Sequence, residues 1–310
     1  MAMDRFARRF LDLAGAGARA RTGEPTLAEM RAGLAGLAIF AGAQTAEAAV
    51  REERLPGSAV PIPIRIYSPS RLSREVLPGL VYFHGGGWLS GGLDSHDSIC
   101  RALAVAGDCR VLAVDYRLAP EHRFPAAIED CLAAVEAVMD RPALFGLDPA
   151  RIGVAGDSAG GNLAVVVCQL ARARGLPLAL QALLCPVMDA LGRTRSRQVL
   201  ASGHFLEERT MVRYWEHYRI AGLDPDDPRV SPSQARDFRN LPPALIHTAE
   251  YDPLCDEGAL YAEALARAGV AVRHCRHPGM IHHFYGLGGA IPYASAALAA
   301  IGAEIREAFA

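Results

Sequence analysis

The sequence predicts an α/β protein with a mostly parallel central sheet flanked by helices. Short apolar runs of strand length alternate along the chain with segments of helical spacing, which is typical of parallel strands joined by crossover helices. The chain has 310 residues, enough for one large domain with an insertion, because single cores stop growing near roughly 250 to 300 residues. One such domain is therefore favoured over two independent domains.

The expected elements follow in order from the N-terminus. Residues 1–50 are rich in Ala, Leu and Arg at helical spacing without a convincing strand, so we expect helices set apart from the sheet there. Short apolar or alternating runs predict strands at 61–67, 80–83, 111–114, 152–155, 180–185, 244–249 and 270–275. Helical spacing predicts helices at 125–139, 159–174, 257–268 and 293–308. Between 186 and 240 the sequence becomes polar and helical, which indicates an insertion.

Charge and cysteine content exclude several classes of function. The formal net charge is −2 and charges of both signs are interspersed, so the sequence lacks the basic stripe that nucleic acid binding requires. The seven cysteines are scattered and form no C-x-x-C pair. This disfavours disulfide and metal frameworks, and it indicates a reduced compartment.

The N-terminal sequence predicts neither export nor a membrane anchor. Arg and Asp residues interrupt every apolar stretch within residues 1–20, so the apolar core of a secretory signal is missing. The longest apolar run, 32–43, is shorter than the roughly 20 residues that a membrane helix needs. We therefore expect a cytoplasmic protein without stable membrane association.

A candidate nucleophile lies between a predicted strand and a predicted helix. Residues 156–160 read Gly-Asp-Ser-Ala-Gly and fit the pattern G-x-S-x-G. In this context the flanking glycines allow a tight turn that exposes the serine hydroxyl at the start of the helix. Ser158 is therefore the predicted nucleophile, and the alternative is a serine that only caps the helix.

A serine hydroxyl needs a histidine to accept its proton and a carboxylate to orient that histidine. With a serine of this kind the partners are expected in the chain order Ser, Asp, His. Asp252 comes just after the predicted strand 244–249 and is the expected carboxylate. Asp256 and Glu257 are nearby alternatives, but they begin the next predicted helix, where acidic residues ordinarily interact with the helix dipole.

Four histidines follow the start of the last predicted strand. His274 lies within the strand pattern and His277 leaves it, whereas His282 and His283 are adjacent in the following loop. A lone histidine is more often a surface or core residue than a base, so three of the four are expected to have no catalytic role. Spacing alone leaves the choice between the two loop histidines open.

A glycine-rich segment follows the predicted strand 80–83. Residues 84–88 read His-Gly-Gly-Gly-Trp, and His84 precedes Ser158 by 74 residues. Backbone amides without side chains around them can approach the oxyanion of an acyl-transfer intermediate, together with the amide of the residue after the nucleophile, Ala159. We therefore predict an oxyanion hole here, and a flexible turn is the weaker alternative.

These blocks, in this order, resemble the bacterial hormone-sensitive lipase-like esterases of the α/β-hydrolase superfamily. The resemblance covers about residues 55–310. Its motifs are HGGGW at 84–88, DYRLAPE at 115–121, GDSAGG at 156–161, TAEYDPL at 248–254 and GMIH at 279–282.

The resemblance implies roles for particular residues. The histidine three positions after Gly279, which is His282, would be the base. The oxyanion loop would comprise Gly85, Gly86 and Gly87, in which the last two glycines and Ala159 donate amides and Gly85 supports the loop. Two departures stand out, since the family usually has glycine at the position of His283 and proline at that of Arg123. The DYRLAPE block is expected to pack beneath the site.

The resemblance also implies an α/β-hydrolase fold with a helical cap. The cap would combine N-terminal helices at 1–50 with an insertion at 186–240, and the core would comprise 51–185 and 241–310. The candidates for the substrate pocket are Phe205 and Leu206 from the cap and Trp88, Asp157, Ile281 and Phe284 from the core. For each apolar candidate, ordinary packing in the core is the alternative.

The expected function is a serine carboxylesterase that hydrolyses short- to medium-chain esters through an acyl-enzyme on Ser158, without a metal or an organic cofactor. Its partner would be a small-molecule ester, with no nucleic acid, and family members often form homodimers. An amidase and a sugar-deacetylating esterase are alternatives, because one triad serves any acyl transfer. A receptor-like binding protein on the same fold is a further alternative, although such proteins lack the catalytic histidine.

Overall fold

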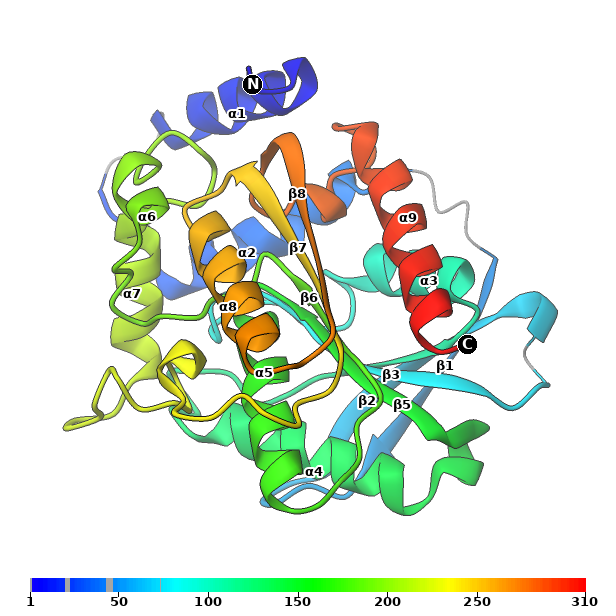
Figure 1. Ribbon diagram of the computed structural model, residues 1–310. Coiled ribbons are helices and arrows are strands. Elements are labelled where there is room, and N and C mark those ends of the chain that lie inside the picture. Colours follow the sequence, from blue (N-terminus) through cyan, green and yellow to red (C-terminus); the bar gives the residue numbers. More distant parts are fainter. Residues whose placement is uncertain (1, 20–22, 43–46, 73) are drawn as a thin grey trace.

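The computed structural model describes residues 2–19, 23–42, 47–72 and 74–310 (Figure 1). Residues 1, 20–22 and 43–46 of the expected N-terminal cap segment lie outside the described residues. Within the described chain, eight strands form one sheet in the order β1-β2-β4-β3-β5-β6-β7-β8. The strands are β1 (Ala48–Leu55), β2 (Ile62–Pro69), β3 (Leu77–Phe83), β4 (Arg110–Val114), β5 (Leu147–Asp157), β6 (Gln181–Leu184), β7 (Ala244–Tyr251) and β8 (Val272–Ile281).

The sheet is mostly parallel, as predicted. Strand β2 runs antiparallel to β1 and β4, and all other neighbouring pairs are parallel. In a parallel sheet the carboxyl ends of the strands share one edge, and ligand sites form there. The end of β5 therefore places Ser158 at the edge where the functional site is expected.

Helices cover both faces of the sheet, so the central strands are apolar on both sides. Along β3, Leu80 and Tyr82 face the core under α3 (Asp97–Gly107) and α9 (Tyr293–Ala308). Val81 and Phe83 face the opposite core, which packs under α4 (Ala126–Asp140), α5 (Ala159–Ala173) and α8 (Cys255–Arg267).

Further helices lie outside this sandwich. They are α1 (Arg5–Arg19) and α2 (Leu27–Gly36) from the N-terminal segment, and α6 (Arg195–Val199) and α7 (Glu208–Tyr218) from the insertion. Helix α2 begins with a capping box, in which the Glu29 amide donates to Thr26 Oγ1 at 3.2 Å and the Thr26 amide donates to Glu29 Oε2 at 2.7 Å. The two segments meet where Arg213 of α7 pairs with Glu24 at 3.0 Å.

The expectation of no strand within residues 1–50 was wrong. Strand β1 begins at Ala48, so the boundary expected after residue 50 falls within it. This edge strand is charged and mostly exposed, and only Leu55 is buried, so it lacks the apolar alternation that predicts a strand. Cross-strand pairing holds it instead, with Glu52 opposite Arg65 and the two side chains 2.6 Å apart.

No helix among the described residues is long and apolar enough to cross a membrane.

Candidate active site

Ser158 occupies a sharp turn between β5 and α5. Its backbone has φ 53° and ψ −119°, an unusual conformation for a residue with a side chain. The flanking glycines permit the turn, because a Cβ on Gly156 would lie 2.3 Å from the Gly160 oxygen and one on Gly160 would lie 1.9 Å from the Phe83 oxygen. The backbone geometry thus requires glycine at both positions.

Asp252 and His282 lie beside Ser158, because β7 and β8 end at the same edge as β5. His282 Nε2 is 3.1 Å from Ser158 Oγ, and His282 Nδ1 is 2.7 Å from Asp252 Oδ2. Asp252 is fully buried, and its other oxygen accepts the Leu254 amide at 2.9 Å. The carboxylate fixes the Nδ1–H tautomer, which leaves Nε2 free to accept the serine proton.

The surroundings of His282 raise the pKa of its imidazole above the ordinary value. Burial lowers the pKa of His282, but the charge of Asp252 and the hydrogen bond to it raise that pKa, and the net pKa lies above the ordinary value. A raised pKa makes the imidazole a better proton acceptor. It also stabilises the imidazolium that forms when the serine loses its proton.

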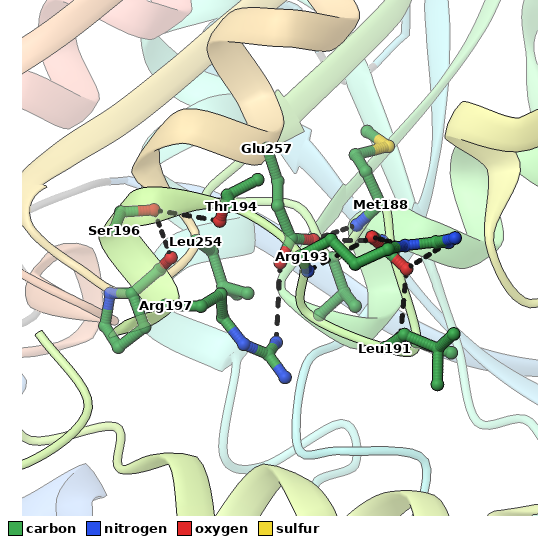
Figure 2. Close-up of polar contacts among 12 residues, drawn as sticks. Met188, Leu191, Arg193, Thr194, Ser196, Arg197, Leu254 and Glu257 are labelled. Carbon is green, nitrogen blue, oxygen red and sulfur yellow. Dashed lines mark hydrogen bonds and ion pairs between the residues drawn. The ribbon is translucent and has the colours of Figure 1, made fainter. Parts of the chain in front are cut away.

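The alternative carboxylates anchor the insertion instead, and Figure 2 shows the contacts of Glu257. Asp256 accepts the Ser196 amide at 2.8 Å, and Glu257 accepts the Met188 amide at 2.7 Å and lies 3.4 Å from Arg197. Burial raises the pKa of Glu257 to about 7, against the charge of Arg197. Both acids lie in the first turn of α8. They hold the start of the insertion onto the first turn of α8.

The other candidate histidines have different partners. His274 Nε2 lies 3.0 Å from Thr248 Oγ1, and His277 contacts His247 and Tyr293. Neither ring is hydrogen-bonded to Ser158. The structure therefore brings only His282 of the four histidines into hydrogen-bond distance of the serine.

His283 turns toward Asp157 rather than Asp252. Its Nδ1 is 3.8 Å from Asp157 Oδ2, and its ring stacks 6.4 Å from that of Phe205. Its backbone has φ 60°, the left-handed region that glycine adopts without steric cost, which accounts for the glycine usual in the resembling family.

The glycine loop after β3 is held by hydrogen bonds around one buried carboxylate. Asp157 Oδ1 accepts the Gly85 amide at 2.9 Å and the Tyr82 hydroxyl at 2.7 Å, and His96 Nε2 lies 3.2 Å from Asp157 Oδ2. Because the Gly85 amide is engaged, Gly85 supports the loop and is not an oxyanion donor. Tyr82 and His96 were not predicted from the sequence, since neither belongs to a site motif.

Gly86, Gly87 and Ala159 carry the remaining amides near the serine. In the described chain none of these three amides donates to another group. Helices α7 and α2 crowd the loop, because a Cβ on Gly87 would lie 2.2 Å from the Tyr214 ring and one on Gly86 would lie 2.9 Å from Leu34. Glycine is needed here to let the backbone lie close to both these helices and the serine.

The DYRLAPE segment supports the loop from below. The Tyr116 hydroxyl donates to the His84 oxygen at 2.6 Å, and the two rings stack 4.2 Å apart. Arg31 of α2 bridges this segment to the loop, since its guanidinium pairs with Glu121 at 2.6 Å and donates to the Leu89 oxygen at 2.8 Å. The unusual Arg123 donates to the Arg219 oxygen at 2.9 Å, at the end of α7.

A cavity of about 560 Å³ lies over Ser158, between the sheet domain and helices α1, α2 and α7. Asp157, Phe205 and Leu206 line this cavity, and so does His283. Residues that the sequence analysis did not single out also line it, among them Leu11 of α1, Met30, Gly33 and Leu34 of α2, and Thr210, Arg213 and Tyr214 of α7.

Three expected pocket residues do not line the cavity. Ile281 and Phe284 are fully buried in the core on the α9 side of the sheet. Trp88 is buried against Tyr218, with ring centroids 4.5 Å apart and nearly parallel. A position next to a catalytic motif in the sequence does not determine the direction of a side chain. All three side chains are buried in the core because they pack against apolar neighbours.

Comparisons with known proteins agree with this geometry. A family model described as alpha/beta hydrolase fold matches residues 80–286. The chain is 44% identical over 253 residues to carboxylesterase NlhH of Mycobacterium tuberculosis, with 79% of each chain covered. It is 46% identical over 241 residues to carboxylic ester hydrolase LipN of the same organism, which covers 76% of this chain and 63% of LipN. Thus the match spans less than two thirds of LipN.

Solved esterase structures superpose on nearly the whole chain. An ester hydrolase from the metagenome of Lake Arreo, in complex with a bipyridine phosphonate derivative, has 39% identity and a TM-score of 0.94, with 99% of each chain covered. The esterase of Pyrobaculum calidifontis has 36% identity and a TM-score of 0.92, with 100% of each chain covered.

The chain belongs to the alpha/beta-hydrolase family, within a group of carboxylic ester hydrolases. The resemblance to hormone-sensitive lipase-like esterases and the predicted α/β-hydrolase fold are confirmed.

Proposed function

We propose that this protein is a serine carboxylesterase that hydrolyses small carboxylic esters of short to medium acyl chain length. The observation that carries the proposal is the hydrogen-bonded chain from Ser158 Oγ through His282 to Asp252, with distances of 3.1 and 2.7 Å. An intact chain of this kind, at the base of a cavity, supports acyl transfer rather than a receptor-like binding role.

In the acylation step Ser158 Oγ attacks the ester carbonyl carbon while His282 Nε2 accepts the hydroxyl proton. The tetrahedral intermediate collapses, the bond to the alcohol oxygen breaks, and His282 returns the proton to that oxygen. In deacylation His282 Nε2 takes a proton from water while the water oxygen attacks the acyl carbon. The bond from that carbon to Ser158 Oγ then breaks, and His282 gives the proton to Ser158 Oγ. Asp252 holds the imidazole in place throughout.

The oxyanion of each tetrahedral intermediate would lie against the amides of Gly86, Gly87 and Ala159. Donors fixed in this way stabilise charge that develops in the transition state, and removal of one such donor typically costs about 10²- to 10³-fold in kcat. Asp157 contributes indirectly, because it holds the Gly85 amide and so fixes the position of the loop.

Cavity size and lining support the proposed substrate class. The cavity of about 560 Å³ is within the range of small-molecule sites, and side chains such as Met30, Leu34 and Phe205 offer apolar contacts to an acyl chain. We further propose that helices α1 and α2 of the N-terminal segment and the insertion 186–240 act together as the cap, since both contribute to this lining.

A panel of p-nitrophenyl esters tests the proposal. We expect higher kcat/KM for the acetate, butyrate and octanoate esters than for the palmitate ester, and little turnover of the matching p-nitroanilides or of acetylated sugars. A preference for palmitate, anilide or sugar acetate would contradict the proposed substrate class. No turnover of any of them by folded protein would contradict the proposed enzymatic function.

A further inference from the structure

A second group of potential ligands lies on β7 and β8, away from the serine. His247 of β7 is directly opposite Cys275 of β8 in the parallel register, and His277 is two residues further along β8. Side chains two residues apart on a strand share one face. The ligand atoms of all three residues lie within 4.8 Å of one another. The group is on the face of the sheet that packs against α9, as the contact of His247 with Glu304 shows.

One nitrogen of each imidazole contacts one nitrogen of the other. His247 Nδ1 and His277 Nε2 are 3.1 Å apart. Two nitrogens at 2.0 to 2.1 Å from a tetrahedral zinc ion lie about 3.3 Å from each other. The observed separation is therefore close to that of two nitrogens on one ion. Both rings would have to rotate so that their lone pairs point to a common ion, with the Cys275 sulfur as the third ligand.

The opposite nitrogen of each ring also has a partner. His277 Nδ1 lies 2.9 Å from the Tyr293 hydroxyl, and His247 Nε2 lies 3.4 Å from Glu304 Oε2. Histidines that bind metals almost always make such an outer contact, commonly to a carboxylate, and it fixes the tautomer and the orientation of the ring.

Burial separates this group from an ordinary surface cluster. His247 is 1% exposed and His277 is 3% exposed. His247 Nε2 and Glu304 Oε2 are buried and make no hydrogen bond of good geometry within the described residues. Cys275 is only partly buried, so an ion could reach the group from solvent. A hydrogen-bonded histidine pair alone does not account for the thiol and the carboxylate gathered around it.

We propose that His247, Cys275 and His277 bind a zinc ion, with Glu304 and Tyr293 as outer partners and water in the fourth position. Two imidazoles and one thiolate form a donor set that suits zinc. Binding releases the Cys275 thiol proton to solvent, and both imidazoles coordinate in the neutral form. This site is separate from the ester hydrolysis proposed above, which requires no metal.

The position of the site suggests a structural role. Asp252 follows His247 by five residues, and His282 follows His277 by five residues. A zinc ion would therefore join the two strands whose ends carry the base and its carboxylate. The scattered cysteines, which form no C-x-x-C pair, disfavoured a metal site at the level of the sequence, and His247 lies 30 residues before His277. Only the strand pairing brings the two together.

Metal titration tests the proposal. The full chain, stripped with a chelator and dialysed, is titrated with ZnCl₂ by calorimetry and with CoCl₂ by absorbance. We expect one tight zinc equivalent per chain, a cobalt band in the near ultraviolet from the Cys275 thiolate, and a higher Tm with zinc. Cys275→Ser should abolish the band, and His277→Gln should weaken zinc binding by about tenfold or more.

Two controls make the outcome specific. His274→Gln changes the neighbouring histidine, which contacts Thr248 instead, and should bind zinc as wild type does. His282→Ala removes a ligand from the other cysteine-containing group, Cys185, Asp252 and His282, and should keep the cobalt band. No zinc uptake by wild type, or equal uptake by folded Cys275→Ser, would overturn the proposal, as would loss of the band in His282→Ala.

Discussion

The charge of Asp252 controls the proton affinity of His282, and this sets the pH range of the proposed reaction. His282 must be neutral to accept the serine proton. Burial lowers its pKa, but the charge of Asp252 and the hydrogen bond to Asp252 together raise the pKa above the ordinary value. Activity is therefore present above this pKa and lost as the pH falls through it.

We predict that kcat/KM falls on the acid side with a midpoint above about 6.5, the ordinary histidine pKa. Asp252→Asn should reduce kcat by about 10⁴-fold, and the residual activity should persist to lower pH because the raising charge is gone. pH profiles of the two enzymes, with circular dichroism as the control for folding, check this. An unchanged midpoint in the variant would contradict the role given to Asp252.

The two adjacent histidines should differ sharply on substitution. His282→Ala should lower kcat/KM for p-nitrophenyl butyrate by about 10⁴-fold or more, because it removes the base. His283→Ala should stay within about tenfold of wild type, since His283 lines the cavity near Asp157 and is not bonded to Ser158. Steady-state kinetics of both variants check this. If His283→Ala is the inactive variant, the proposed base is wrong.

Some residues of the candidate site could be predicted from the sequence, and others could not. Ser158 and Asp252 follow strands, so their common location was predictable from the order of the elements. His282 was separated from His283 only by the family resemblance. His96 and Arg31 could not be predicted, because each reaches the glycine loop from a segment without a motif, and only tertiary packing brings it there.

Among the elements, the glycine loop after β3 is the one most constrained by its neighbours. Gly87 has φ 63° and its Cβ position lies 2.2 Å from Tyr214, whereas Gly175 has φ 70° with open space around it. An alanine at either position bears the cost of the left-handed backbone, roughly 1 to 2 kcal/mol. Only Gly87 adds a clash beside the serine.

We predict that Gly87→Ala lowers kcat by about 10²-fold or more, because the loop amides must move, while Gly175→Ala keeps wild-type kcat. Thermal unfolding measures the backbone cost in both variants, and ester kinetics measure the effect on the site. Similar losses of activity in the two variants would show that the backbone strain, rather than the position of the loop, matters.

Helix α2 is joined to the core by the side chain of Arg31. Because that side chain is 35% exposed and Glu121 is 54% exposed, we expect the interaction to contribute roughly 1 kcal/mol. Arg31→Met should therefore raise KM about fivefold with a smaller change in kcat, since the cap lining loosens while the triad stays intact. Arg267→Met, which removes an exposed pair with Glu263, is the matched control. A loss confined to kcat would contradict this role.

Element prediction succeeded where strands are buried on both faces and failed at the edge of the sheet. Strand β3 is buried along its whole length, and its apolar run was readily recognised. Strand β1 was missed because charged pairs with β2, rather than apolar burial, hold it. The inward or outward direction of Trp88 could not be predicted either, because it depends on the contact with Tyr218.

Across the whole molecule, stability should depend on packing and not on cross-links. All seven cysteines are free thiols, and six of them are buried. We predict the same Tm with and without dithiothreitol in metal-free buffer, measured by differential scanning calorimetry. A lower Tm in reductant would reveal a disulfide and contradict this account.

During turnover of the proposed reaction, Ser158 should carry the acyl group. Wild type, Ser158→Ala and His282→Ala are incubated with a p-nitrophenyl alkylphosphonate, and the products are analysed by intact mass and peptide mapping. We predict one adduct per wild-type chain, located on Ser158, with loss of ester hydrolysis in proportion to labelling, and no adduct in Ser158→Ala. An adduct on another residue, or full ester hydrolysis by Ser158→Ala, would contradict it.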